Sequence, residues 1–156
     1  MRRPPTYRRG CLMVKEGQIE IKLPNNVAFI CALRAFVKNL ARRVGFQPTK
    51  AEDIELVVDE LCNNAMEHGS DPNSPVWVII SVRDSALDIL VRDEGGGERS
   101  RRFLENLPRI RRKHASPYSE RGHGIYIVEM LSDYFCFSQN PMGGTDARVI
   151  FYKIEG

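Results

Sequence analysis

The sequence predicts an α+β fold in which helices pack on one face of a mainly antiparallel, mixed sheet. Two observations support this two-layer α/β sandwich. Apolar residues recur at helical spacing in two long segments, and short segments with alternating apolar residues are typical of strands. The predicted order is one strand, two helices, two strands, an irregular segment, one helix and two strands, which suits a sheet covered on one side.

Composition indicates one soluble globular domain. The 156 residues are 42% hydrophobic and 28% charged, and the net charge of +3 does not by itself imply nucleic-acid binding. Residues 1–17 are basic and carry two prolines, so we expect a disordered arm followed by a single domain at 18–156. No segment has the length of a signal peptide or membrane span, and the four cysteines lie far apart. These features favour a cytoplasmic protein without a membrane partner.

The first strand and helix are predicted from residues 18–45. Residues 18–23 alternate and end at Pro24, and Asn25 or Asn26 is expected to cap the following helix. Gly45 would end that helix. Its predicted buried stripe contains Val27, Ile30, Leu33, Phe36, Val37, Leu40 and Val44.

The second helix is predicted to open at Thr49, with Glu52 completing a capping box. It would run to about His68 and end at Gly69. Within it, Glu60, Asn64 and His68 recur every fourth residue and therefore share one face.

A carboxylate one turn from a carboxamide suits phosphate chemistry. Glu60 could accept a proton from an attacking hydroxyl or water, and Asn64 could give Mg²⁺ an oxygen ligand. The alternative for this helix alone is a solvated polar face, and His68 could equally be a cap or a packed imidazole.

The second half of the chain contains four strands, one helix and a long basic segment. The strands are predicted at residues 76–83, 87–92, 134–138 and 147–154, and a helix carries Ile125, Val128 and Leu131. Residues 98–121 lack a clean period, with one short helix around Phe103, Leu104 and Leu107. We expect this segment, called the lid, to be disordered or a functional cover. Its eight basic residues are Arg99, Arg101, Arg102, Arg109, Arg111, Arg112, Lys113 and Arg121.

The sequence Asp93-Glu94-Gly95-Gly96-Gly97 follows a predicted buried strand. Glycines let a backbone approach a ligand closely, and an aspartate at a strand end can accept a hydrogen bond from the exocyclic amine of adenine. An Asp-Gly turn fits the same letters, so this motif alone is weak.

Gly122-His123-Gly124 opens a helix. Its free N–H groups and the positive end of the helix dipole would form an anion site, although glycines also end loops for conformational reasons. Arg121 could supply a cation for developing phosphoryl charge. The hydroxyl of Thr145, after Gly143-Gly144, could support Asp93 or simply begin a strand.

Taken in order, these motifs are far more specific than any one of them. The chain resembles the GHKL ATPase superfamily over residues 18–153, and within it the anti-sigma factor serine kinases of the RsbW and SpoIIAB type. ELCNNAMEHG is similar to their N-box, VRDEGGG to the first glycine box and ERGHGIYIVEMLSD to the second.

The resemblance implies a Bergerat-type site for ATP and Mg²⁺. Glu60 would be the general base and Asn64 the Mg²⁺ ligand, while Asp93 would recognise adenine. Further residues are implied by position: Gly95, Gly97 and Thr145 at the adenine pocket, Gly122, His123 and Gly124 at the phosphates, Arg121 at the terminal phosphates, and Arg34 as a partner-binding arginine. For Arg34, a place on a solvated helix face is an equal alternative.

The function implied is a serine/threonine protein kinase that is also an anti-sigma factor. It would sequester a sigma factor, phosphorylate an anti-sigma antagonist of the STAS type, and form a homodimer. A catalytically weak, nucleotide-gated binding module is the alternative, in which ATP orders the lid for a partner. Nucleic-acid binding is a minor possibility, because the basic lid lacks interleaved aromatic residues.

Overall fold

The computed structural model describes residues 16–69, 71–95, 97–113 and 123–154, without the side chains at 68, 69, 99, 110–113 and 123. Within these described residues, five strands form one sheet in the order β1-β2-β3-β5-β4. Their bounds are β1 (Gly17–Leu23), β2 (Val76–Val82), β3 (Ala86–Arg92), β4 (Tyr134–Gln139) and β5 (Thr145–Tyr152). All four pairings between these described strands are antiparallel, so the "mixed" part of the prediction is wrong.

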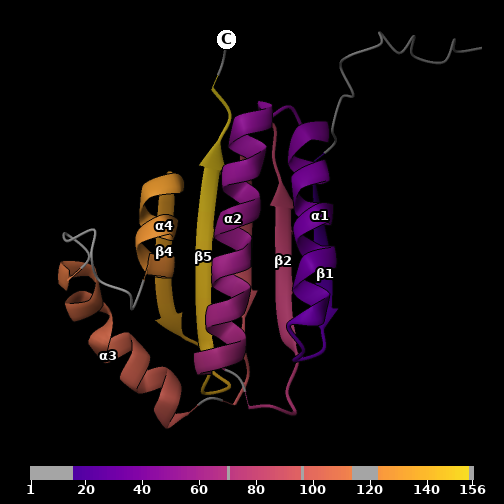
Figure 1. The fold of residues 1–156 in the computed structure, drawn as a ribbon. Coiled ribbons are helices and arrows are strands. Elements are labelled where there is room, and N and C mark those ends of the chain that lie inside the picture. Colours follow the sequence, from indigo (N-terminus) through magenta and orange to yellow (C-terminus); the bar gives the residue numbers. More distant parts are fainter. Residues whose placement is uncertain (1–15, 70, 96, 114–122, 155–156) are drawn as a thin grey trace, which may run out of the picture.

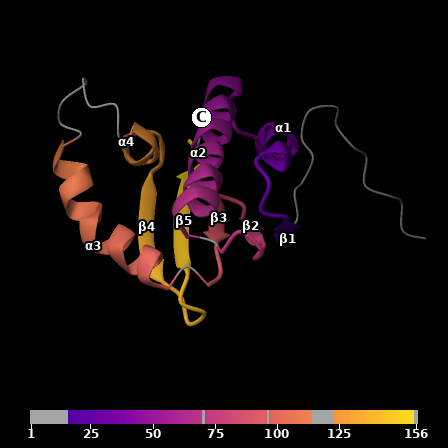
Figure 2. The same ribbon diagram turned by 60° about the horizontal axis from the view of Figure 1, so that its bottom comes forward.

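Helices cover one face of this sheet, as predicted. Figures 1 and 2 show α1 (Ala28–Arg43), α2 (Pro48–Asn64) and α4 (His123–Leu131) in a row over it. Helix α3 (Glu98–Lys113) lies at the edge of the sheet next to β4, with contacts to β4 and α4. Helix α3 therefore covers the β4 edge of the sandwich and contacts the π-helical turn (Ala65–Gly69) that follows α2.

The core lies between the helices and the sheet. Strand β2 alternates strictly, burying Val76, Val78, Ile80 and Val82 against the helices. Helix α2 crosses the middle of the sheet and buries six side chains. These are Ala51, Ile54, Val57, Val58, Leu61 and Cys62. Because the apolar face of α2 points at the sheet, its polar residues are left on its flanks.

Both long helices begin differently from the prediction. Helix α2 starts at Pro48, a residue preorganised for a first helical turn, and no described side chain caps it, so the capping box from Thr49 to Glu52 is wrong. At α1 the N-cap position is Val27, without a side-chain cap, and the predicted cap Asn26 lies one residue earlier. Its Oδ1 still accepts a 2.9 Å hydrogen bond from the N–H of Ala28, the first residue of the helix. Two members of the predicted stripe, Val27 and Phe36, are exposed, since the sheet meets a narrower face of α1.

The lid prediction is wrong in its secondary structure. Residues 98–113 form one helix that continues through Pro108, instead of a short helix within an irregular segment. Glu98 stabilises its first turn, because its carboxylate pairs with Arg101 at 2.7 Å and Arg102 at 3.2 Å. Residues 114–121 of the predicted lid lie outside the described residues. Among the described helices, none is long and apolar enough to cross a membrane.

Candidate active site

The end of α2 differs from the predicted helix at the point where the polar motif lies. The α-helix ends at Asn64, and Ala65–Gly69 form a π-helical turn. Single π-turns interrupt helices at functional sites more often than elsewhere. The regular α-helical spacing on which the shared face of Glu60, Asn64 and His68 was predicted therefore ends at Asn64. The side chain of His68 lies outside the described residues.

Glu60 and Asn64 face the first turn of α4. Both side chains are half-buried on the flank of α2. A Cβ added to Gly124 would clash with Oε2 of Glu60 and would lie 3.3 Å from its Cδ and 3.8 Å from Nδ2 of Asn64. With Glu60 in this position, only glycine fits at residue 124. The N-terminal end of the α4 helix dipole therefore lies close to a carboxylate and a carboxamide.

Asp93 is the buried acid of the site. It follows β3 directly and is 2% exposed. Its Oδ1 accepts a 2.9 Å hydrogen bond from the N–H of Thr145, and its own N–H donates to the Thr145 carbonyl at 3.1 Å. Burial raises the pKa of Asp93 to about 6, the Thr145 hydrogen bond opposes this, and the nearby charge of Asp146 adds to it.

Two buried polar atoms near Asp93 lack a partner. Within the part of the chain that the structure describes, neither Oγ1 of Thr145 nor Nδ2 of Asn64 has a hydrogen-bond partner. Buried polar groups are nearly always satisfied, so such pairs of orphaned atoms indicate a site for a polar ligand.

These residues line one small cavity. Its walls are Leu61, Asn64, Ala65, Val91, Asp93, Phe103, Phe137, Thr145 and Ala147, and its volume is about 20 Å³. That volume suits a single water, not a purine. Phe103 of α3 narrows it, with its ring 5.8 Å from the ring of Phe137 in an edge-on arrangement. The chemistry of the walls therefore fits a nucleotide base, but the space beside Phe103 is too small to hold one with the ring in this position.

The two glycines assigned to this pocket have the conformation that only glycine adopts easily. Gly95 has φ +74° and Gly97 has φ +47°. The N–H of Gly97 donates a 2.7 Å hydrogen bond to the carbonyl of Gly143, in the turn between β4 and β5. The start of α3 is thus fastened to the turn that precedes Thr145.

Asn140 is a buried polar residue beside Asp93 that was not predicted as part of the site. It is 5% exposed and its side-chain amide donates to the carbonyl of Asp93 at 2.8 Å. The signal was the Asn-Pro pair at 140–141, which is typical of a turn with a side-chain hydrogen bond. Gly144 was noted only as part of a turn, yet a Cβ there would lie 2.5 Å from Oδ1 of Asp93.

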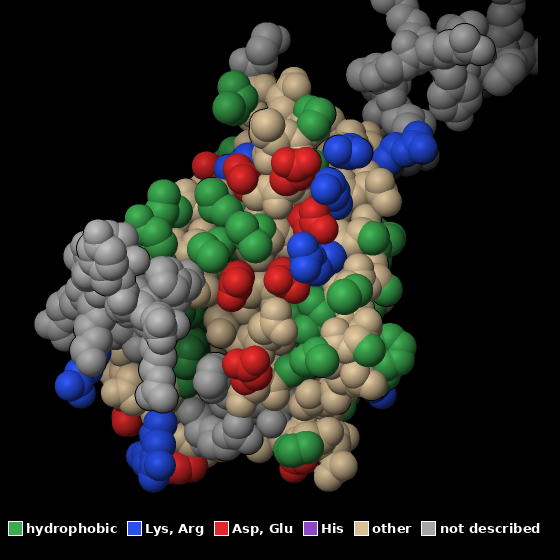
Figure 3. Space-filling view, in the orientation of Figure 1, with side chains coloured by type: hydrophobic (Ala, Val, Ile, Leu, Met, Phe, Trp, Pro, Cys, Tyr) green, Lys and Arg blue, Asp and Glu red, His purple; other side chains and the backbone are tan. Residues whose placement is uncertain are grey.

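Other predicted site residues are not brought to the pocket by the described structure. Arg121 and Gly122 lie outside the described residues, as does the side chain of His123. Arg34 lies on α1, where its guanidinium approaches Glu55 at 3.5 Å and Asp59 at 3.6 Å. Figure 3 shows these acids of α2 as a red row beside the basic side chains of α1.

A magnesium ion would find few protein ligands here. Among the described residues, no three His, Cys, Asp or Glu side chains gather in a group able to hold a metal. Asn64 is the one predicted ligand. This fits Mg²⁺, which keeps several waters and is bound largely through substrate phosphates.

Comparison with known proteins agrees with this geometry. The sequence pattern of the histidine kinase-like ATPase domain matches residues 23–151. The serine-protein kinase RsbW of Bacillus subtilis is 30% identical over 140 residues, covering 88% of this chain and 87% of that protein. RsbW of Bacillus pumilus is 30% identical over 120 residues, covering 74% of each chain.

A solved structure has the same fold. The crystal structure of the RsbU and RsbW domains of Rv1364c from Mycobacterium tuberculosis superposes with a TM-score of 0.61 at 18% identity. The superposition covers 86% of this chain and 32% of that one. The chain belongs to the family of histidine kinase-like ATPase domains and resembles its RsbW members.

Proposed function

We propose that this chain is an ATP-dependent serine/threonine protein kinase and anti-sigma factor. It phosphorylates an anti-sigma antagonist of the STAS type and sequesters a sigma factor when that antagonist is absent. The observation that carries the proposal is the placement of Glu60 against the glycine-opened N-terminus of α4, one helical turn from Asn64, which lines the same pocket as the buried Asp93. The likeness to RsbW kinases over most of both chains supports it.

The residues divide the work between the two ends of the nucleotide. The carboxylate of Asp93 accepts a hydrogen bond from the exocyclic amine of adenine, and Thr145 Oγ1 supplies a second polar contact to the base. The N–H groups of the first turn of α4 bind phosphate oxygens. Arg121, Gly122 and His123 lie next to that turn in the sequence, and we propose that they add charge and backbone donors to the phosphate site.

Transfer requires one proton acceptor. The hydroxyl of the partner's serine or threonine loses its proton to Glu60 as its oxygen bonds to the terminal phosphorus, and the bond from that phosphorus to ADP breaks. Asn64 would hold Mg²⁺, which supplies charge neutralisation for the phosphates. Glu60 and Asn64 lie one turn apart on α2, so a single rigid element positions the base and the metal ligand.

Phe103 in the pocket favours a second candidate function. A base that enters would have to displace the Phe103 ring from Phe137, and we propose that this changes the surface that α3 presents. A nucleotide-gated binding module would use this change without phosphorylating the partner. The intact Glu60 argues for the kinase.

The proposal includes several features of the whole protein. Residues 18–156 form one cytoplasmic domain that acts as a homodimer, and residues 1–17 are a basic arm. Arg34 contributes to the sigma-factor surface through the exposed third of its side chain. Nucleic acid and membrane are not partners.

The decisive experiment is phosphorylation of a cognate STAS-type antagonist with Mg-ATP, read by mass spectrometry. We expect one phosphorylated serine or threonine, and a rate about 10²–10⁴-fold lower in Glu60→Gln, which keeps the shape of the side chain but removes the base. Calorimetry should show that both proteins bind ATP. If the protein binds ATP but phosphorylates no cognate antagonist, the kinase function is contradicted and the nucleotide-gated binding module is the function that remains.

A further inference from the structure

Asn140 holds the β4–β5 turn together from inside. Its side-chain oxygen accepts hydrogen bonds from the N–H groups of Met142 at 3.1 Å and Gly144 at 3.0 Å. Its backbone completes the turn, because its N–H donates to the Gly144 carbonyl at 2.9 Å and its carbonyl accepts from Gly143 at 3.1 Å. One buried side chain thus fixes a loop that contains two glycines.

The amide nitrogen of Asn140 extends the same network to Asp93. It donates to the backbone carbonyl of Asp93 at 2.8 Å and to Oδ1 of Asp146 at 3.1 Å. Asp146 is itself fixed, because Arg92 donates to both of its carboxylate oxygens at 2.8 Å. The backbone of Asp93 is therefore held by a donor whose own position is set by a two-point ion pair.

The turn that Asn140 builds also holds the Asp93 carboxylate. Gly144 packs directly on Asp93, and the next N–H, from Thr145, donates to Oδ1 of Asp93. On the other side, the carbonyl of Gly143 accepts from the N–H of Gly97 at 2.7 Å, at the start of α3. The positions of the Asp93 carboxylate and of the start of α3, called the lid helix below, are therefore both set by the β4–β5 turn.

We propose that Asn140 is a positioning residue that sets the orientation of Asp93 for adenine and couples that carboxylate to the start of the lid helix. This inference rests on the proposed function, because it assigns Asn140 a part in selecting ATP. Changes of about 1 Å or less in the position of a carboxylate that recognises one donor are enough to lose discrimination. In the described loop 140–144, the side-chain hydrogen bonds shown all come from Asn140.

The test compares ATP with purine riboside triphosphate, which lacks the exocyclic amine, by calorimetry with Mg²⁺. The wild type should prefer ATP, and Asp93→Asn should lose that preference. In Asn140→Ala we expect the preference to fall by about tenfold or more while affinity for the analogue changes little. Asn39→Ala, on the exposed surface of α1, is the matched control and should behave like the wild type.

A second variant separates the two halves of the network. Asn140→Asp keeps an acceptor for Met142 and Gly144 but loses the donor to Asp93 and places a charge beside Asp146. It should form the turn yet lose the preference for ATP. Amide exchange gives a readout without nucleotide, since the Thr145 and Gly97 N–H groups should lose protection in Asn140→Ala.

The outcomes distinguish this inference from the proposed function. A wild type that binds neither nucleotide would refute the ATP site, and the role of Asn140 in selecting ATP with it. A wild type that prefers ATP, beside an Asn140→Ala protein that folds and keeps the full preference, would refute only the role of Asn140. The same holds if Asn140→Ala fails to fold and Asn140→Asp retains the preference.

Discussion

Gly124 and Glu60 lie in contact across the gap between α4 and α2, and no side chain fits between them. The atom that a Cβ at Gly124 would meet is the far end of the Glu60 side chain. At Gly144, by contrast, a Cβ would lie 2.7 Å from the backbone carbon of Asp93. A side chain added at Gly124 can be accommodated by rotation of the Glu60 side chain. One added at Gly144 would require the backbone of Asp93 to move.

We predict that Gly124→Ala removes activity without unfolding the protein. Glu60 has to swing aside, and a displaced base costs about 10²-fold in phosphoryl transfer, whereas the unfolding free energy should change by less than about 1 kcal/mol. Denaturant titration and an antagonist phosphorylation assay measure the two effects.

Gly144→Ala is the matched comparison. It forces the backbone of Asp93 to move, and overpacking of this kind costs about 1–3 kcal/mol. Both stability and ATP affinity should fall. Equal effects of the two alanines on stability would show that Gly124 does not act through the movable end of Glu60.

Asp93 provides a pH-dependent prediction. Its pKa is raised from 3.8 unfolded to about 6 folded, so between these values the folded state binds the extra proton. Its contribution to stability is fully present below pH 4 and is lost as the pH rises through 6. This difference between the folded and unfolded pKa corresponds to about 3 kcal/mol of unfolding free energy, which is an upper value for a buried group.

The measurement is the unfolding free energy of wild type and Asp93→Asn from pH 4 to 8 without nucleotide. Asparagine does not titrate, so the variant should gain on the wild type by about 1–3 kcal/mol across that range while losing ATP binding. Asn39→Ala, on the exposed surface of α1, changes no titratable group and is the control, which should show no such gain. A pH-independent difference between wild type and Asp93→Asn would contradict the buried, high-pKa carboxylate.

The sequence predicted the fold where periodicity is strong. The alternation in β2 and the apolar stripe of α2 determine which faces meet. Asn64 and Asp93 come to line one pocket as a result, and Glu60 lies one turn before Asn64 on α2. Family resemblance added the role of each residue, which spacing alone left open.

What the sequence did not show depends on tertiary contacts. The π-turn after Asn64 has no sequence signature. In α3, the apolar residues do recur at helical spacing, but they are few among charged residues, and Pro108 in their midst argued against one continuous helix. Asn140 was missed because its partners, Asp93 and Asp146, come from other segments. Turn chemistry predicts that an Asn-Pro pair bends the chain, not which backbone its amide will hold.

Phe103 yields a prediction about access to the pocket. Its edge-on contact with Phe137 closes a space of about 20 Å³, and such a contact contributes about 0.5–1.5 kcal/mol to the closed form. In Phe103→Ala the binding-competent form is more populated, so apparent ATP affinity should rise about 2–10-fold. Calorimetry with Mg-ATP measures this.

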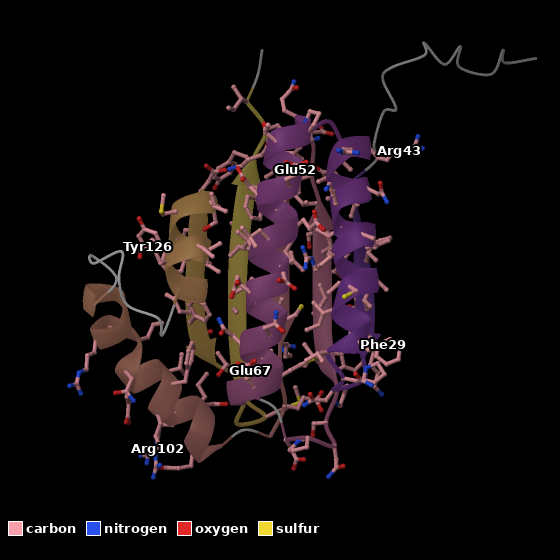
Figure 4. The ribbon with its side chains drawn as sticks, in the orientation of Figure 1. Phe29, Arg43, Glu52, Glu67, Arg102 and Tyr126 are labelled. Carbon is pink, nitrogen blue, oxygen red and sulfur yellow. The ribbon has the colours of Figure 1, made fainter. Side chains whose placement is uncertain are left out.

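The control for Phe103 is Phe29→Ala, an exposed phenylalanine on α1 at a distance from α3 in Figure 4. It should leave ATP affinity unchanged. Weaker binding by Phe103→Ala would mean that the ring packs on the base in the bound state, so that it is a wall of the site and not a cover over it.

The last prediction concerns Arg34. Its guanidinium lies 3.5 Å from Glu55 and 3.6 Å from Asp59, and its side chain is 36% exposed. Exposed ion pairs of this length contribute about 0–1 kcal/mol, and Lys38 remains 3.0 Å from Glu55 when Arg34 is removed. Arg34→Ala should therefore fold and bind ATP like the wild type.

If Arg34 binds the sigma factor directly, the affinity of Arg34→Ala for that partner should fall about tenfold or more, since arginines are frequent hot spots of interfaces. Calorimetry with the cognate sigma factor makes the measurement, and Arg43→Ala, in the exposed last turn of α1, is the control. Unchanged sigma affinity in Arg34→Ala would assign the residue to the α1–α2 surface alone, where its two acidic neighbours already account for its position.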